Sequence, residues 1–590
     1  MKKVNDIKTS SLVSLLALLV LLWGCGEPDS APESGLRLRF LPQADGAAPA
    51  GLACEASAQG EGLNGARGAV NIGAVRLRVL SDEGEVVADK VLEVVGQKDA
   101  LLFEGIRVGR GYEVEVAACP TVDGEAIWVG VERGIAVAES RTTEREIQLL
   151  PAEGFGCTGG DLGEGLAFAA AFSPDGDDVV IAGGLTSWTG AGQATATARI
   201  QRFVRATGAF EVLEVALPSA QAMGSSLVAS RSPGEPPSML IVGGVSAVVE
   251  GVDSQHGDLL PFGPAAGVEI GRAMWVGGDP LAVVVESWPT IPRFAAGVGV
   301  TRVEGVDIVA VVGGITYAEL GARISDTAEI IRLGPDGPVS TPVQLRVQRV
   351  GPAVVELAPG VLALVGGNVG NDGALIEVLD LRGEFPVNVP GVITPVEGLP
   401  GDIAALARPS AFPQVVLLNG GLVVVGGLPI FPGADPGLRP VASAAIDPVL
   451  FRLRFDDPAS GAFALDSPLS FNGALERPAS QRAFATRLVG EAGQVWFMGG
   501  VNPDVASPFV PRVDSLAVDL ESGEVSTAGP LPYRAIGATS VELWDGVTLS
   551  FGGVVEVAGG LNQLNTTSTA VVRRGARSSA ARCADPPVDP

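Results

Sequence analysis

The chain has 590 residues, a net charge of −27 and a hydrophobic fraction of 47%. That fraction supports a large core and excludes a disordered chain. A field of this sign repels phosphate backbones, which excludes nucleic acid as a partner, and it also excludes a polybasic grip on anionic lipid. The 80 glycines and 43 prolines separate short runs rich in Val and Ile, and no helical period persists after residue 30. The sequence therefore predicts an all-β protein with many turns.

The first 24 residues have the features of an export signal. Lys2 and Lys3 follow Met1, and an apolar stretch occupies residues 12–23. A basic start and a short apolar core are typical of a signal peptide, and the stretch is short for a membrane anchor. We therefore expect a signal peptide at residues 1–24.

The signal ends in Leu22-Trp23-Gly24-Cys25, which resembles the lipobox of bacterial lipoproteins. The resemblance implies cleavage after Gly24 and acylation of Cys25, with palmitate among the attached chains. Gly26 stands where an Asp would imply retention at the inner membrane, so the resemblance implies a cell-envelope protein of the outer membrane. Several acyl chains on one cysteine give a stable membrane anchor. The residues that follow are rich in Pro, Ser and acids, so we expect residues 25–35 to form a tether between the membrane anchor and the folded part.

Four cysteines remain if Cys25 is lipidated: Cys54, Cys119, Cys157 and Cys583. An even number in an oxidising compartment predicts disulfides, and four cysteines allow three connectivities. Domain membership favours Cys54–Cys119 with Cys157–Cys583. No CxxC spacing occurs and the chain has one histidine, so a metal site is the weaker interpretation and we expect none.

Residues 36–150 are expected to form a first domain of seven strands. Alternation of apolar and charged residues, as in Val75-Arg76-Leu77-Arg78-Val79, indicates half-buried strands. Seven strands in this length fit an antiparallel sandwich. The expected strands are 36–41, 74–80, 86–95, 101–106, 112–118, 126–131 and 143–150.

The segments 102–106 and 109–114 resemble the end of a carboxypeptidase-regulatory-like or immunoglobulin-like module. The resemblance implies a spacer or adhesion unit for this domain. An unrelated sandwich would have much the same functional content.

A second region, residues 155–585, contains a repeated pattern of about four apolar residues followed by two glycines. The intervals between the first glycines are 60, 70, 53, 60, 73 and 53 residues. Repetition at this period indicates units that bury their faces against one another, as in a propeller. Paired glycines suit strand ends that need unusual φ values or close backbone approach. The pairs are Gly183-Gly184, Gly243-Gly244, Gly313-Gly314, Gly366-Gly367, Gly426-Gly427, Gly499-Gly500 and Gly552-Gly553.

These units resemble kelch repeats, with later turns at 205–208, 458–461 and 521–523 and a unit start at 532–538. The resemblance implies a β-propeller, and we expect seven blades. A further pair, Gly277-Gly278, is interpreted as an insertion in the second blade because two units would not fit in 70 residues. A second insertion is expected at 428–445. A strand from before Gly183 should complete the last blade, with a Cys157–Cys583 disulfide locking that seam.

We find no catalytic set and expect no cofactor. Copper oxidases on kelch propellers need paired His and Tyr ligands, whereas this chain has His256, Tyr112, Tyr317 and Tyr533. A Ser-His-Asp triad could use His256 alone, which favours an exposed loop histidine. The acidic stretch 173–178 could offer carboxylates to calcium, but a turn between strands is favoured.

The predicted function is therefore binding. A rigid ring with long loops suits recognition of a protein or glycan, and the segments 250–280 and 428–447 are the expected contact loops. Two alternatives stay open: a polysaccharide-active lyase or hydrolase using carboxylates and Arg, and a purely structural envelope protein.

Overall fold

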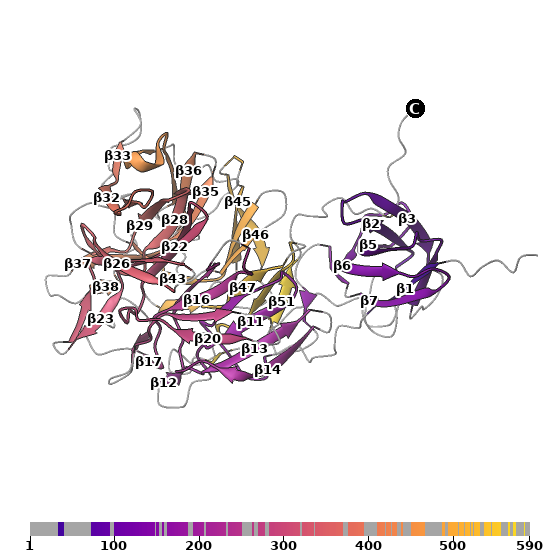
Figure 1. The fold of residues 1–590 in the computed structure, drawn as a ribbon, viewed down its shortest axis with the longest axis horizontal. Coiled ribbons are helices and arrows are strands. Elements are labelled where there is room, and N and C mark those ends of the chain that lie inside the picture. The colour runs from indigo at the N-terminus through magenta and orange to yellow at the C-terminus, as the bar shows by residue number, and fades with distance from the viewer. Residues whose placement is uncertain are drawn as a thin grey trace, which may run out of the picture.

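The computed structural model shows an all-β chain with a small body beside a larger one (Figure 1). In the ranges that it describes there is no α-helix, and one 3-10 turn, η1, spans Pro458–Ser460. The described residues are 34–40, 72–94, 100–147, 149–152, 156–158, 162–186, 193–205, 208–231, 234–250, 262–264, 270–277, 283–318, 321–334, 337–369, 376–394, 410–418, 420–425, 427–432, 438–440, 450–465, 486–489, 494–504, 507–511, 514–519, 521–522, 524–530, 536–543, 546–555, 565–566, 570–573 and 583.

The small body consists of two sheets whose apolar residues share one core. One sheet has the order β4-β1-β7 and the other β3-β2-β5-β6-β8. The expected strands of this region agree with β1 to β7 within a few residues at most ends. The strands are β1 (Gly35–Phe40), β2 (Ala74–Leu80), β3 (Val86–Glu93), β4 (Ala100–Glu104), β5 (Gly109–Cys119), β6 (Trp128–Val137), β7 (Thr142–Ile147) and β8 (Leu150–Pro151).

Alternation along β2 explains why the two sheets meet. Leu77 and Val79 are fully buried and share a cluster with Leu36 and Leu38 of the other sheet. On the opposite face, Arg76 donates to both carboxylate oxygens of Asp89, at 2.8 and 2.5 Å. Burying one face of each strand removes its apolar surface from water, at about 25 cal/mol per Å².

The larger body contains seven sheets built on a common four-stranded antiparallel plan, which we number S1 to S7 in chain order. Their strand orders are β10-β11-β13-β14, β15-β16-β19-β20, β21-β22-β25-β26, β28-β29-β31-β32, β35-β36-β39-β40, β41-β42-β45-β46 and β47-β48-β51-β9, with β33 added to S5 beside β40.

The strands of S1 to S7 have the following bounds. S1 to S3 contain β10 (Ala170–Phe172), β11 (Val179–Ala182), β13 (Arg199–Val204), β14 (Ala209–Ala216), β15 (Ser225–Ala229), β16 (Ser238–Val242), β19 (Met274–Gly277), β20 (Val284–Ser287), β21 (Gly297–Val303), β22 (Val306–Val312), β25 (Thr327–Arg332) and β26 (Val339–Gln344). S4 to S7 contain β28 (Ala353–Ala358), β29 (Val361–Val365), β31 (Ile376–Asp380), β32 (Val387–Pro390), β33 (Val392–Thr394), β35 (Gln414–Leu418), β36 (Gly421–Val425), β39 (Leu450–Arg454), β40 (Ala462–Leu465), β41 (Thr486–Val489), β42 (Gln494–Met498), β45 (Asp514–Asp519), β46 (Val525–Pro530), β47 (Thr539–Glu542), β48 (Thr548–Phe551), β51 (Ala570–Arg573) and β9 (Gly156–Cys157).

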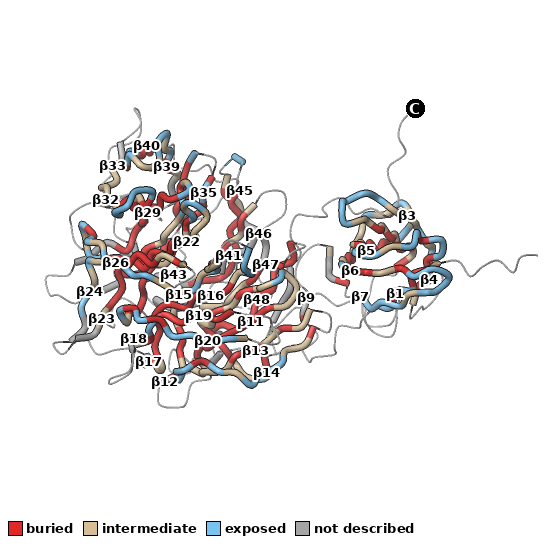
Figure 2. Tube along the Cα trace, viewed as in Figure 1, coloured by how far each residue is buried: buried red, intermediate tan, exposed pale blue. Residues whose placement is uncertain are grey.

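Most second strands are apolar on both faces because they are buried between two neighbouring sheets; β48, with Thr548 and Ser550 on one face, is an exception. In β11, Val180 and Ala182 pack toward S2, whereas Val179 and Ile181 pack toward S7. Similar clusters join S2 to S3, S3 to S4, S4 to S5 and S5 to S6, and β41 contacts β47 between S6 and S7. Figure 2 shows these inner strands buried and outer strands such as β14 largely exposed or intermediate.

S7 draws its fourth strand from the start of the region. Gly156 and Cys157 in β9 pair with Val572 and Val571 in β51. This confirms that a strand preceding the first Gly-Gly pair completes the last unit. The N-terminal and C-terminal ends of the region therefore share one sheet.

Short additional strands form further small sheets, and most of them follow the paired glycines in the chain. They form the sheets β12-β17-β18, β23-β24, β27-β30, β34-β37-β38, β43-β44 and β49-β50. Their bounds are β12 (Gln193–Thr195), β17 (Ala247–Glu250), β18 (Phe262–Pro264), β23 (Ile315–Ala318), β24 (Gly321–Ile324), β27 (Gln348–Arg349), β30 (Asn368–Val369), β34 (Ser410–Ala411), β37 (Leu428–Pro432), β38 (Leu438–Pro440), β43 (Val501–Asp504), β44 (Ser507–Pro511), β49 (Val554–Val555) and β50 (Asn565–Thr566).

The first glycine of the extra pair in the second unit belongs to the sheet itself. Gly277 ends β19, the third strand of S2, so the inserted residues lie earlier, between β16 and β19. The expected contact segment 250–280 thus includes a buried strand, because Met274, Trp275 and Val276 are all core residues. The insertion expected at 428–445 contains β37 and β38.

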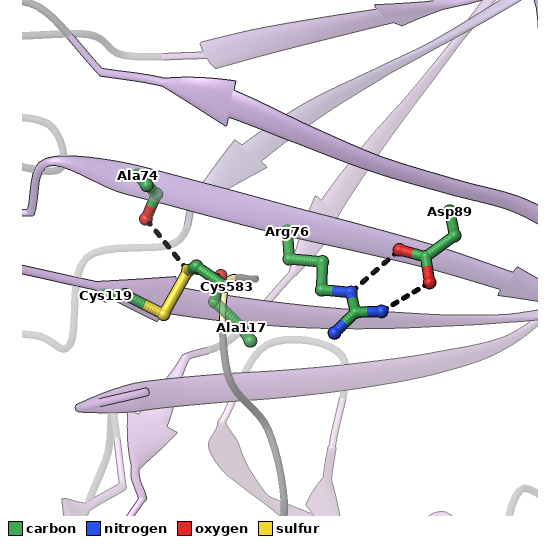
Figure 3. The surroundings of a disulfide bond; sticks show 6 residues. All are labelled: Ala74, Arg76, Asp89, Ala117, Cys119 and Cys583. Atoms are coloured by element: carbon green, nitrogen blue, oxygen red, sulfur yellow. Dashed lines mark hydrogen bonds and ion pairs between the residues drawn. A yellow bond between two sulfur atoms is a disulfide. The ribbon is translucent and has the colours of Figure 1, made fainter. Parts of the chain in front are cut away.

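The expected disulfide pairing is wrong. Cys119 is bonded to Cys583, with an S–S distance of 2.09 Å, so neither Cys54–Cys119 nor Cys157–Cys583 can form alongside it (Figure 3). Cys583 is fully buried with Ala74 and Cys119. The repeat pattern groups the C-terminal segment with the larger body, whereas Cys583 returns to the end of β5 in the small body.

Several expected features lie outside the described residues: the signal peptide, Cys25, Cys54, His256, Gly426 and Tyr533. Among the residues that are described, no helix has the length and apolar character to cross a membrane.

Candidate functional site

The paired glycines form the seams between neighbouring sheets. The amide N–H of Gly184 donates to the carbonyl of Gln221 in the next unit, and a Cβ on Gly183 would lie 2.3 Å from that oxygen. The seam between the last sheet and the first has the same arrangement. The amide N–H of Gly553 donates to the Leu166 carbonyl, and a Cβ on Gly552 would lie 2.1 Å from that oxygen. Every repeat glycine in the described part has φ between 60° and 110°. The sequence interpretation of these glycines is therefore confirmed on both grounds.

In four successive units, the carbonyl that contacts the glycine pair of the preceding sheet belongs to an equivalent residue. We call this residue the entry residue of its unit. A Cβ added to the first glycine of the preceding sheet's pair would lie within 2.4 Å of this carbonyl oxygen in every case. The entry residues are Leu166, Gln221, Arg293 and Arg349. All four are at most 3% exposed, so polar side chains here need internal partners.

The two arginine entry residues hydrogen-bond within their own units, although Nε of Arg293 has no partner. Arg349 is fully buried, donates to Glu377 and to the Gly366 carbonyl, and burial lowers the pKa of its guanidinium while Glu377 opposes that shift. Arg293 donates to the Gly313 carbonyl and to Ser325 and Thr327, and burial likewise lowers its pKa. These groups are structural, since a buried charge is stable only when paired and hydrogen-bonded.

Two series of backbone hydrogen bonds link neighbouring sheets near their inner strands. Phe168 N–H donates to Gly537 at 2.8 Å, and Met223 N–H donates to Phe168 at 3.1 Å. Phe412 N–H donates to Gly351, whose own N–H donates to Ala295. All six residues have φ between 52° and 67°. Four of them are not glycine, and such conformations persist only where the surrounding structure holds them.

These residues surround a cavity of about 240 Å³, which we call the central cavity. Its wall is mainly apolar, and the Ser225 and Thr539 hydroxyls donate to the Ala296 and Ala169 carbonyls of adjacent units. The lining residues are Phe168, Ala169, Met223, Gly224, Ser225, Phe294, Ala295, Phe412, Gly537, Ala538 and Thr539.

A larger cavity of about 420 Å³, which we call the S2 pocket, opens beside the insertion of the second unit. Its size lies within the usual range of about 300–1,000 Å³ for small-molecule sites. Part of its wall comes from the expected contact segment 250–280. The lining residues are Ser219, Ala220, Gln221, Ser246, Ile270, Gly271, Arg272, Met274, Ser287 and Pro292.

Gln221 also has a buried side-chain atom without a hydrogen-bond partner, its amide oxygen. The residue is 3% exposed and lines the S2 pocket. Leaving a buried acceptor unsatisfied costs about 1–3 kcal/mol.

The acidic stretch 173–178 forms the turn between β10 and β11. Asp175 accepts from the backbone N–H groups of Asp177 and Asp178, and Asp178 pairs with Arg202. Within the described ranges no three His, Cys, Asp or Glu residues gather in a way that could hold a metal ion. Tyr112 lies in the small body and donates to the Val108 carbonyl.

Sequence reasoning missed Gln221 and Arg272 as site residues. The sequence alone predicts the inserted segment of the second unit as a binding region, but it does not single out Gln221. To find Gln221, the seven units would have to be aligned with one another on their glycine pairs. With that alignment, a polar residue stands at a position otherwise held by Leu166 or by paired arginines.

No protein-family model and no curated protein matches the chain. Among solved structures, one similar chain is a fungal alcohol oxidase of the AA5 family in complex with copper. It is 16% identical with a TM-score of 0.43, and the match covers 69% of this chain and 74% of that chain. A likeness of this degree carries no argument about the fold or the chemistry of this chain.

Proposed function

We propose that the larger body is a seven-bladed kelch-like β-propeller and the small body an immunoglobulin-like sandwich. Seven sheets on one four-stranded plan, each packed on the next, support the first assignment. The hydrogen bond from Phe168 to Gly537 and the pairing of β9 with β51 support closure of the ring. Two sheets around a shared core support the second assignment.

We further propose that the protein is exported and anchored at Cys25 in the outer membrane. The lipobox-like sequence supports the anchor. The Cys119–Cys583 disulfide supports an oxidising compartment, because buried structural disulfides persist there and are rare in reducing ones.

In this setting the propeller serves as a non-catalytic binding scaffold for a protein or glycan ligand. The observation that carries this proposal is the S2 pocket, a cavity of ligand size lined by both polar and apolar residues. Among the described residues that line either cavity there is no carboxylate. That composition favours binding over a lyase or hydrolase that uses acidic residues.

The test is capture by the purified propeller-containing chain on an array of bacterial envelope glycans, with chemical cross-linking in parallel for protein partners. Alanine replacement of residues 251–261 should reduce capture, because this segment belongs to the inserted residues of the second unit, where the sequence predicts a contact loop. The replacement must spare β19, whose removal would unfold S2. Replacement of the turn residues 334–338, between β25 and β26, is the control. Unchanged capture by the first variant would exclude this placement, and release of shortened glycan would favour an enzyme.

A further inference from the structure

We propose that the central cavity binds a small, uncharged apolar molecule that contains a single aromatic ring. This inference goes beyond the proposed capture of a protein or glycan, because it concerns a different cavity and a different class of ligand. Three features of the cavity carry it: large apolar residues held in a strained conformation, a wall whose polar groups are paired within the protein, and a volume that suits one ring.

The first feature is a backbone position that favours glycine but holds larger residues. In six of the sheets, the residue two places before the first strand has φ between 52° and 67°. Gly351 and Gly537 occupy this position in S4 and S7, so the turn itself requires no side chain. Phe168, Met223 and Phe412 occupy it in S1, S2 and S5, where the left-handed conformation costs about 1–2 kcal/mol per residue. Such strain indicates that these side chains serve packing or function.

Packing accounts for part of this arrangement and leaves the cavity open. The Phe168 ring lies against Gly537 and the Phe412 ring against Gly351, since a Cβ on either glycine would come within 2.6 Å of the ring. Phe168, Met223 and Phe412 nevertheless keep part of their surface exposed, and about 240 Å³ beside them is unfilled. These side chains therefore form a wall that solvent and a ligand can reach.

The second feature is the pairing of polar groups in the wall. The Ser225 hydroxyl donates to the Ala296 carbonyl, and the Thr539 hydroxyl donates to the Ala169 carbonyl. No charged side chain occurs among the described residues that line the cavity. A charged ligand would lose its hydration here without gaining a partner of opposite charge, so the wall selects an uncharged, apolar one.

The third feature is size. An apolar cavity of about 150 Å³ can bind benzene, so one ring with a small substituent suits the central cavity of about 240 Å³. Phe168 and Phe412 provide aromatic rings for offset or edge contacts with the ligand. Phe294 and Ala295 join the wall to an apolar cluster that is shared by several sheets. A bound ring would extend this cluster and remove its own apolar surface from water.

The probe is 4-fluorotoluene, titrated into the folded chain and followed by fluorine NMR, with 4-fluorobenzoate as the charged comparison. We expect saturable binding of fluorotoluene and at least about tenfold weaker binding of fluorobenzoate, whose carboxylate finds no cation in the wall. The control for adsorption to the surface is Phe385→Ala, which removes a phenylalanine that is 73% exposed and should leave both affinities unchanged. Absence of saturable fluorotoluene binding, or equal binding of the two probes, would overturn the inference.

Two substitutions test whether the probe binds in the central cavity. Ala295→Met copies Met223 at the equivalent position, and it should weaken fluorotoluene binding by about tenfold or more because the added side chain fills the cavity. Met223→Gly copies Gly351 and Gly537, so it relieves strain and enlarges the cavity. It should shift the preference of the protein from fluorotoluene toward the larger 2-fluoronaphthalene.

Thermal unfolding establishes that each variant is folded before it is titrated. An unchanged preference in folded Met223→Gly would place the probe elsewhere and overturn the assignment, whatever Ala295→Met does. Capture of a glycan or protein on the array does not depend on this cavity, so the proposed function and this inference can fail separately.

Discussion

At the residue scale, the seams depend on buried polar groups whose partners are all internal. Arg349 and Glu377 are both fully inaccessible, and their nitrogen and oxygen atoms lie 2.9 Å apart. Glu377 also accepts from the Arg346 backbone and from Asn388, so its carboxylate is surrounded by donors. Such a pair contributes little net stability compared with apolar packing, but removing one partner leaves the other charged and unpaired.

Arg349→Met should therefore lower the stability of the larger body by about 3–5 kcal/mol, because Glu377 loses its cation. Thermal unfolding followed by circular dichroism measures the shift. Adding Glu377→Met to the first substitution should recover part of the loss. A double variant less stable than the single variant would contradict this description of the pair.

At the element scale, each unit is a sheet that cannot bury both faces alone. Short, mainly apolar runs ending in two glycines predict the second strand of every sheet, because most of these strands are buried on both sides and stop where backbones meet. The alternation of the first body likewise predicts its strands. The distant pairings could not be predicted this way, since Gln221 and Arg272 line one cavity, and Cys119 bonds to Cys583, only through the folding of whole units.

Gly552→Ala should weaken the seam between the last and first sheets. A Cβ there would lie 2.1 Å from the Leu166 carbonyl, and the residue has a φ of 65°. Gly420→Ala is the matched control, with a φ of 68° and no atom within 4 Å of its Cβ. Both variants incur the left-handed backbone penalty of about 1–2 kcal/mol, but Gly552 alone adds a steric clash.

The measurement for this pair is amide hydrogen exchange with mass spectrometry. Gly552→Ala should speed exchange in β9 and β51, whereas Gly420→Ala should leave those strands protected. Equal protection of β9 and β51 in both variants would show that close packing at this seam does not depend on glycine.

At the scale of the whole molecule, the small body is held against the larger one by several contacts. Arg133 of β6 pairs with Asp177 of S1 at 2.8 Å and donates to the Asp175 carbonyl at 2.7 Å. Arg205 of S1 donates to the Val131 carbonyl of β6. The disulfide adds a covalent link, because Cys583 follows S7 and ends against β2 and β5 (Figure 3). The small body is thus more closely fixed than a free spacer.

Replacing both Cys119 and Cys583 by Ala should lower the thermal midpoint without changing the strand content. The bond closes a loop between residues 464 apart, and the chain-entropy model gives a stabilisation of up to about 6 kcal/mol for it. Differential scanning calorimetry measures the change, with Arg382→Gln as a surface control. An unchanged midpoint would mean that the link adds nothing to the contacts made by Arg133 and Arg205.

The proposed scaffold is exported, lipid-anchored and bonded through its C-terminal segment to its first domain. Non-reducing peptide mass mapping of the protein extracted from membranes examines all three features in one experiment. We expect an acylated Cys25 and a peptide joining Cys119 to Cys583, which by cysteine parity leaves Cys54 and Cys157 to each other. An unmodified Cys25 together with a free thiol at Cys119 would contradict both the export and the anchoring of this protein.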